Sequence, residues 1–184
     1  MRKISNEELR RPSAEEFAAA RKMAVTVVLD NVRSALNVGS FLRTCDAFAA
    51  ERIMLCGITA APPDREIHKT ALGAELTVAW ERRASTVECV EQLHEEGYTV
   101  LAIEQVEGAA MLQNLDRADL FAEQNGKKYA LVFGNEVEGV DQRVADMCDG
   151  AIEIPQVGTK HSLNVSVAGG VVLWEFFKYY LAQE

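Results

Sequence analysis

The sequence predicts an α/β fold in which helices flank a mainly parallel β-sheet. Short runs of β-branched and aliphatic residues alternate along the chain with segments of helical periodicity, which is the pattern of repeated strand–helix units. Several of these runs are apolar at successive positions, as expected of strands that are buried on both faces. The 184 residues contain no internal repeat and no low-complexity linker, so we expect one domain with a substantial core.

The first 22 residues are expected to form a short basic arm or helix (residues 1–22), followed by a single domain at residues 23–184. Ser13 and Glu16 stand at the spacing of a capping box, which predicts a helix that opens at Ser13 and runs to about residue 22. Clustered cationic side chains favour contacts with phosphate groups. In the arm they are Arg2, Lys3, Arg10, Arg11, Arg21 and Lys22.

The first half of the domain is expected to contain strands at residues 25–29, 53–56 and 77–80. Asn37 has the preference of an N-cap and is expected to open a helix after the first strand. Asp64 is expected to cap a second, shorter helix in the same way. The core side of the helix after Asn37 is expected to carry Phe41, Leu42, Cys45 and Phe48.

A second capping sequence opens the other half of the domain. Ser85 and Glu88 predict the start of a helix, and Gly97 predicts its end. The elements that follow are expected to be a strand at 98–103, a polar connection at 104–125, a strand at 129–133, a helix at 141–147, a strand at 151–154 and a helix at 164–181.

The helix expected at residues 164–181 is apolar over most of its circumference. One stripe facing a core cannot bury all of these side chains, so the helix must be covered on several sides. A central place in a large core and a place in a homodimer interface both meet this requirement. The side chains concerned are Val165, Val167, Val171, Val172, Leu173, Trp174, Phe176 and Phe177.

The formal net charge of the chain is −9, whereas many nucleic-acid-binding domains are basic. Local clusters decide phosphate contacts more than the overall sum does. Any RNA affinity is therefore expected to be modest and to fall with salt. The cationic side chains in or beside the candidate site loops are Arg33, Arg43, Arg65, His68, Lys69, Lys160 and His161.

Several classes of protein are excluded by what the sequence lacks. No run approaches the roughly 20 apolar residues that span a bilayer, and the N-terminus has no apolar segment like that of a signal peptide. The four cysteines are scattered, without a Cys-x-x-Cys pair, and with the three histidines they offer no metal-ligand spacing. We expect a cytoplasmic protein with reduced thiols, no bound metal and no membrane association.

Three motifs, far apart in the chain, point to the chemistry. The first contains Asn37 and Arg43, the second is an apolar run that ends in Gly-Asn-Glu at Glu136, and the third is the Pro/Gly loop at residues 154–166. In this order they resemble the motifs of the TrmH branch of the SPOUT RNA methyltransferases. Those enzymes transfer a methyl group from S-adenosylmethionine to a ribose 2′-hydroxyl. The resemblance extends from about residue 25 to residue 174.

The resemblance implies a SPOUT-type fold with a C-terminal trefoil knot, a rare exception to the rule that chains are unknotted. It also implies S-adenosylmethionine as cofactor, tRNA or rRNA as partner, and a homodimer formed through the C-terminal helix. The candidate residues lie at the carboxyl ends of the expected strands, which is where open α/β sheets bind ligands. The expected cofactor-binding residues are Ile103, Gly134, Ile154, Ser162 and Leu163.

The same resemblance implies which residues serve the reaction. A guanidinium is a poor base because its pKa exceeds about 12, so we expect Arg43 to hold an RNA phosphate and polarise the hydroxyl while the phosphate or a neighbour takes the proton. Glu136 is expected to orient Arg43 or Asn164. Ser162 and Asn164 either cap the last helix or reach the ribose. The implied catalytic set is Asn37, Arg43, Glu136, Ser162 and Asn164, and the expected phosphate contacts are Arg33 and Lys160.

Two other functions remain open at this point. A SPOUT enzyme that methylates a base would need a different group to bind the acceptor. An RNA-binding or assembly protein with the same fold would not need Arg43, Glu136 and Asn164 together. A dinucleotide-binding dehydrogenase is excluded, because no G-x-G-x-x-G sequence follows an expected strand.

Overall fold

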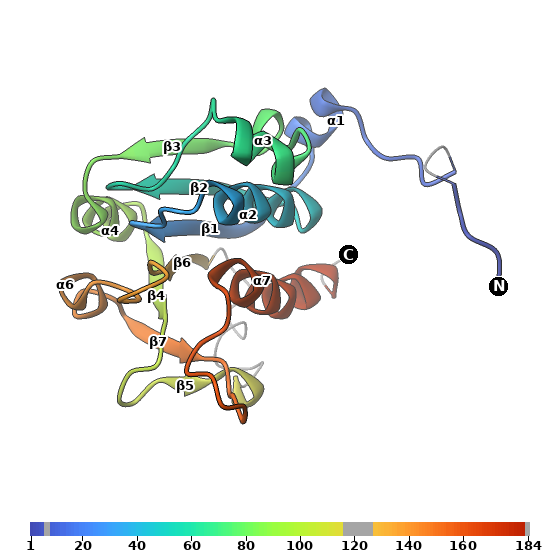
Figure 1. The fold of residues 1–184 in the computed structure, drawn as a ribbon. Helices are drawn as coiled ribbons and strands as arrows, with labels where there is room; N and C mark the ends of the chain where they lie inside the picture. Colours follow the sequence, from blue (N-terminus) through green and yellow to red (C-terminus); the bar gives the residue numbers. More distant parts are fainter. Residues whose placement is uncertain (6–7, 116–126, 183–184) are drawn as a thin grey trace.

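A computed structural model describes residues 1–5, 8–115 and 127–182 of the chain. Seven parallel strands in these residues form one sheet in the order β3-β2-β1-β6-β4-β7-β5, which confirms the predicted parallel α/β class (Figure 1). The strands are β1 (Met23–Asp30), β2 (Ala50–Cys56), β3 (Trp80–Arg83), β4 (Tyr98–Ile103), β5 (Ala110–Met111), β6 (Lys128–Phe133) and β7 (Gly150–Glu153).

Helices cover both faces of the sheet, and each face has its own apolar core. Side chains alternate along β1: Val27 and Leu29 pack with α2, α3 and α7, whereas Val28 packs with α4 and α6. All three are fully buried, which explains why the strand is apolar at successive positions. The helices are α1 (Ala14–Ala19), α2 (Ala35–Ala47), α3 (Arg65–Ala71), α4 (Thr86–Glu95), α6 (Gln142–Ala145) and α7 (Val165–Leu181), with 3₁₀ turns at Ala74–Leu76 and Leu112–Asn114.

The start of α2 differs from the prediction. Ser34 is its N-cap, with the Ser34 hydroxyl accepting from the Asn37 N–H, so Asn37 lies inside the first turn. The prediction that Asn37 caps this helix is therefore wrong. Serine and asparagine cap equally well, and the choice between them depends on contacts that Asn37 makes elsewhere in the fold.

The strand expected at residues 77–80 is also shifted. Residues Ala74–Leu76 form a 3₁₀ turn, the Thr77 hydroxyl bonds to Asp46 of α2, and the strand begins only at Trp80. The polar connection expected at 104–125 contains β5 and a 3₁₀ turn, and its residues 116–125 lie outside the described part of the chain.

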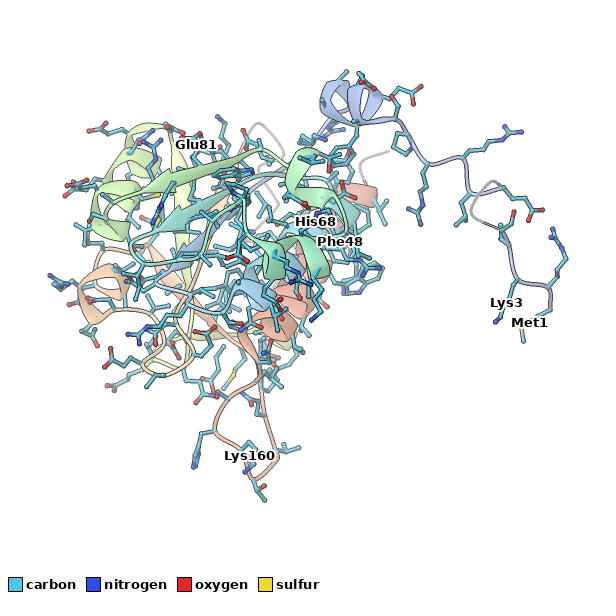
Figure 2. The ribbon with its side chains drawn as sticks, turned by 45° about the horizontal axis from the view of Figure 1, so that its top comes forward. Met1, Lys3, Phe48, His68, Glu81 and Lys160 are labelled. Carbon is cyan, nitrogen blue, oxygen red and sulfur yellow. The ribbon has the colours of Figure 1, made fainter. Side chains whose placement is uncertain are left out.

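The N-terminal arm leads away from the body of the molecule (Figures 1 and 2). Its helix α1 opens with the predicted capping box of Ser13 and Glu16 but ends at Ala19, earlier than expected. None of the residues of α1 is buried. The arm joins the domain beside the end of α7, where the Tyr180 hydroxyl donates to the carbonyl of Arg21.

The last helix, α7, is buried on one side only. Val172, Leu173 and Phe176 enter the core, whereas Val167, Val171 and Trp174 remain 53%, 38% and 46% exposed. A central place in the core of this chain therefore does not account for the apolar circumference. Within the described residues, α7 and the other helices are too short or too polar to span a bilayer.

Candidate functional site

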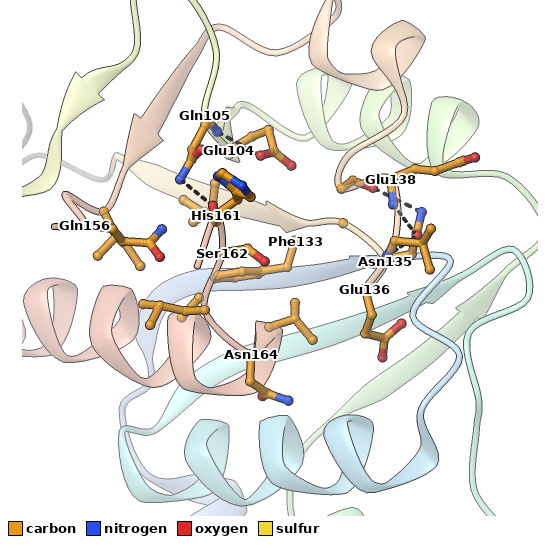
Figure 3. Close-up of a pocket in the computed structure, with 18 of the residues that line it drawn as sticks. Glu104, Gln105, Phe133, Asn135, Glu136, Glu138, Gln156, His161, Ser162 and Asn164 are labelled. Atoms are coloured by element: carbon orange, nitrogen blue, oxygen red, sulfur yellow. Dashed lines mark hydrogen bonds between the residues drawn. The ribbon is translucent and has the colours of Figure 1, made fainter. Parts of the chain in front are cut away.

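A cavity of about 510 Å³ lies at the carboxyl ends of β4, β6 and β7 (Figure 3). One wall is the turn that follows β6, and the other is the segment between β7 and α7. The cavity has the size of pockets that bind cofactors and drug-sized ligands. All five residues expected to bind the cofactor line it: Ile103, Gly134, Ile154, Ser162 and Leu163.

The turn after β6 shapes the first wall of the cavity. Asn135 and Gly139 exchange two backbone hydrogen bonds of 3.0 and 3.1 Å, which close a tight loop around Glu136. Gly134 lies directly against this loop. A Cβ atom on Gly134 would stand 1.9 Å from the carbonyl carbon of Gly139, so no other residue fits here without displacing backbone.

A hydrogen-bonded network of three side chains joins the turn to α2 and α7. The Asn37 amide nitrogen donates to Glu136 Oε1 at 2.8 Å, and the Asn37 carbonyl oxygen accepts from Asn164 Nδ2 at 3.1 Å. Both ends of the Asn37 amide are thereby used, which fixes the orientation of this buried side chain. Figure 3 shows Glu136 and Asn164 pointing toward α2 from opposite walls.

Asn164 serves two purposes at once. Its carbonyl oxygen caps α7 by accepting from the N–H groups of Ser166 and Val167, at 2.9 and 3.3 Å. Its amide nitrogen is left to donate to Asn37. Asn164 therefore caps α7, as one of the two alternatives expected, while its contact with a ribose stays a prediction; Ser162 lies exposed on the wall of the cavity.

The network also sets the charge of Glu136. Partial burial acts to raise the pKa of this carboxyl, but the hydrogen bond from Asn37 and those from the backbone N–H groups of Glu136, Ser34 and Arg33 outweigh it and lower the pKa. Glu136 is accordingly an anion at neutral pH. It contacts Asn37 directly and reaches Asn164 through Asn37.

We expect Glu136→Gln to lower thermal stability at pH 7, by about 1 kcal/mol or less, because the carboxylate is largely exposed. A lowered pKa in the folded state stabilises the fold above the unfolded pKa, and that stabilisation is lost as the pH falls through the folded pKa. The difference in melting temperature between wild type and variant should therefore shrink on acidification. A difference that is constant from pH 7 to pH 3 would contradict this assignment.

The cationic candidates lie outside the cavity. Arg43 is exposed on α2, and six helical residues turn it about 120° away from Asn37 around the helix axis. Arg33 is exposed in the loop before α2, and Lys160 is exposed in the segment before α7. The structure thus does not bring Arg43 to the cavity of its own chain, because Phe41, Leu42 and Cys45 pack into the core and leave Arg43 on the exposed side of α2.

Two residues that the sequence analysis missed hold the cavity together. The Glu104 carboxylate accepts from the N–H groups of Val140 and Gln105, at 3.0 and 2.8 Å, and so ties the end of β4 to the turn after β6. The Gln105 side chain donates to the carbonyl of His161 at 3.1 Å, across the mouth of the cavity. Both residues directly follow Ile103 at the carboxyl end of β4, so the rule that open α/β sheets bind ligands at the carboxyl ends of strands also points to them.

Ser166 is a third residue that was missed. Its hydroxyl lies 2.7 Å from the Asn164 carbonyl oxygen and 3.4 Å from that of Asn37. It joins α7 to the network from within the first turn of the helix. Its contact with Asn164 is local to the helix start, whereas Asn37 is brought to it by the fold and leaves no signal in the sequence.

Comparison with known proteins identifies a family. A family model described as the SpoU rRNA Methylase family matches residues 24–174. A tRNA (guanosine(18)-2′-O)-methyltransferase of Thermus thermophilus is 34% identical over 168 residues, which are 91% of this chain and 81% of that protein.

Solved structures share the fold. The A. aeolicus TrmH/SpoU tRNA modifying enzyme has a TM-score of 0.78 at 25% identity, over 92% of this chain and 82% of that one. An AdoMet-bound rRNA methyltransferase from Sinorhizobium meliloti has a TM-score of 0.76 at 27% identity, and the match covers 89% of this chain but only 60% of that one. With the cavity, the network and a family model that matches most of its length, this chain belongs to the SpoU rRNA methylase family.

Proposed function

We propose that this protein transfers a methyl group from S-adenosylmethionine to a ribose 2′-hydroxyl of tRNA or rRNA. The observation that carries the proposal is the Asn37–Glu136–Asn164 network, which borders the cavity formed by the five expected cofactor residues. The names of the T. thermophilus and S. meliloti relatives, a tRNA 2′-O-methyltransferase and an AdoMet-bound rRNA methyltransferase, support it.

The lining of the cavity suits S-adenosylmethionine, which supplies an electrophilic methyl group on a sulfonium centre. Ile103, Ile154 and Leu163 offer apolar surface for the adenine ring. Glu104, Glu136 and Glu138 also line the cavity and favour a positively charged centre. Among the described residues, no group of histidine, cysteine and carboxylate side chains is placed to hold a metal ion, and the reaction as proposed needs none.

The reaction as proposed also needs Arg43, which a second copy of the chain can supply. The exposed apolar stripe of α7, formed by Val167, Val171 and Trp174, is suited to pack against the same stripe of another chain. Since α2 packs beside α7, such a homodimer would place the exposed Arg43 of one protomer close to its partner. Arg43 would then hold the RNA phosphate, while Glu136 or that phosphate accepts the proton.

The trefoil knot is part of the same proposal. Residues 155–164 lead from β7 back across the sheet to α7, which packs against α2. A segment that returns in this way to an element laid down early in the chain is compatible with the knot that the family resemblance implies.

The homodimer can be tested with one substitution. Val171→Asp places a charge in the centre of the α7 stripe and should convert a dimeric protein into monomers, as measured by sedimentation equilibrium. Ile58→Asp, which adds the same charge at an exposed apolar residue away from α7, should leave the dimer intact. Wild-type protein that sediments as a monomer at tens of micromolar would contradict the proposed dimer.

Activity is tested by incubating the protein with radiolabelled S-adenosylmethionine and total RNA from a strain that lacks its gene. The labelled RNA is then digested with alkali. Label in alkali-resistant dinucleotides establishes ribose methylation, because a blocked 2′-oxygen cannot cleave the adjacent linkage. Label in mononucleotides would show base methylation instead, and cofactor binding without labelled RNA would favour a protein that binds RNA without modifying it.

A further inference from the structure

A second cavity, of about 640 Å³, lies at the β3 edge of the sheet, and none of its lining residues lines the cofactor cavity. It is enclosed by the loop before α3, by α3 itself, by the 3₁₀ turn and by the first residue of β3. Figure 2 shows His68 of this group on the surface. The lining residues are Pro62, Pro63, Asp64, Arg65, His68, Glu75, Leu76 and Trp80.

The walls of this cavity are apolar and partly rigid. Trp80 is half-buried, and its indole N–H donates to the carbonyl of Glu75 at 3.3 Å, which fixes the plane of the ring. Leu76 remains 82% exposed beside it, and two prolines form the opposite part of the lining. A fixed aromatic ring on the wall of an open cavity is a surface on which a flat ring can stack.

One strong hydrogen-bond acceptor is built into these apolar walls. The Glu75 carboxylate is only 9% exposed, and it accepts from the Gly73 N–H at 3.0 Å and pairs with His68. The hydrogen bond from His68 outweighs the effect of burial and lowers the pKa of Glu75. Each of its oxygens can accept a second hydrogen bond, so the anion can receive amino or imino groups of a ligand.

Among the described charged groups around the cavity, Arg65 is available to pair with a ligand. Asp64 accepts from two N–H groups of α3, and Glu66 pairs with Lys69 at 3.5 Å. Arg65 is exposed and has no ion pair within the described residues. A guanidinium at the rim matches the phosphate of a nucleotide whose base is stacked below.

We infer that this cavity binds an unstacked nucleotide of the RNA, distinct from the methylated one, with its base on Trp80, its amino group on Glu75 and its phosphate on Arg65. The inference rests on the proposed function, which supplies the RNA. A proline-rich peptide could also stack on Trp80, but it offers neither a phosphate to Arg65 nor a base edge to Glu75. Guanine, whose imino and amino groups form a donor pair, fits this carboxylate best, and uracil fits it least.

The fluorescence of Trp80 can report whether this cavity is occupied. The Trp174→Phe variant leaves Trp80 as the sole tryptophan, because the chain contains two. We expect GMP to quench its fluorescence with an affinity about tenfold higher than that of UMP, and Glu75→Gln to remove most of this preference. Arg65→Ala should weaken quenching by both nucleotides, whereas Arg82→Ala, an exposed arginine of β3 outside the cavity, should not.

Short single-stranded RNA should quench Trp80 in the same variant. Fluorescence that is unchanged by nucleotides and by RNA would overturn the inference, as would quenching by a polyproline peptide alone. Methyl transfer is measured separately, so the two proposals fail independently. If Trp80 is quenched but no RNA is methylated, the nucleotide site is supported and the proposed reaction is rejected. If RNA is methylated but Trp80 is not quenched, the reaction is supported and the nucleotide site is rejected.

Discussion

Replacement of Arg43 by alanine is expected to lower the rate of methyl transfer by about a thousandfold, which is the usual cost of removing one donor that stabilises developing charge. The affinity for S-adenosylmethionine should stay within a few-fold of wild type, because Arg43 does not line the cofactor cavity. The fold should also be unaffected, since the side chain is exposed on α2. Single-turnover rates and calorimetric titration with the cofactor measure the two effects separately.

Matched variants show what the guanidinium contributes. Arg43→Lys keeps the charge but loses the planar fork, so its rate should fall between those of wild type and Arg43→Ala. Arg82→Ala removes an exposed arginine elsewhere and should leave the rate unchanged. Wild-type turnover in Arg43→Ala would mean that Arg43 has no part in the reaction.

Mixed dimers then decide which chain supplies Arg43. Chains that carry Arg43→Ala are combined with chains that carry Asn37→Ala, each inactive alone. If Arg43 acts on the cavity of its partner, one site of each mixed dimer has both residues intact, and about half of the wild-type activity per mixed dimer returns. If Arg43 acts within its own chain, the mixture stays inactive.

Gly134→Val is expected to abolish cofactor binding and to destabilise the protein by about 3 kcal/mol or more, at the upper end of overpacking effects. The cause is a collision of the new side chain with backbone atoms, and not the filling of the cavity. Its Cβ would stand 1.9 Å from the carbonyl carbon of Gly139 and 2.0 Å from the nitrogen of Val140. These are backbone atoms, so the whole turn that carries Glu136 would have to move.

Thermal unfolding and calorimetric titration with S-adenosylmethionine test this prediction. Gly134→Ala should already show most of the effect, because the first carbon atom makes the collision. Gly150→Ala is a suitable control, since its Cβ would meet its nearest neighbour at an ordinary 3.5 Å. Normal cofactor affinity in Gly134→Ala would contradict the proposed role of the turn.

The sequence is sufficient to locate most of the strands and to gather the expected cofactor residues in one place. The predicted strand at residues 98–103 coincides with β4, because a continuous apolar run bounded by Gly97 and polar residues has one interpretation. The five expected cofactor residues line one cavity because the ends of β4, β6 and β7 and the segment that leads from β7 to α7 meet at the same edge of the parallel sheet.

The start of α2 could not be predicted in this way. Ser34 and Asn37 are both good caps, and the helix start depends on the bond from Asn37 to Glu136, which lies far away in the sequence. The direction of Arg43 does not depend on that start, because the predicted core residues Phe41, Leu42 and Cys45 are buried and leave Arg43 exposed. The contacts of Glu104 with Val140 and of Ser166 with Asn37 are likewise made by the fold, because these residues are far apart in the sequence.

The fixed orientation of the Asn37 side-chain amide has one further consequence. Its carbonyl oxygen accepts a hydrogen bond from Asn164 at the start of α7, and its amide nitrogen donates one to the carboxylate of Glu136. The same Asn164 caps α7, the helix that carries the proposed dimer stripe. In the proposed dimer, any shift that association through α7 causes in the protonation of Glu136 must be matched by an equal shift, in free energy, that protonation causes in association.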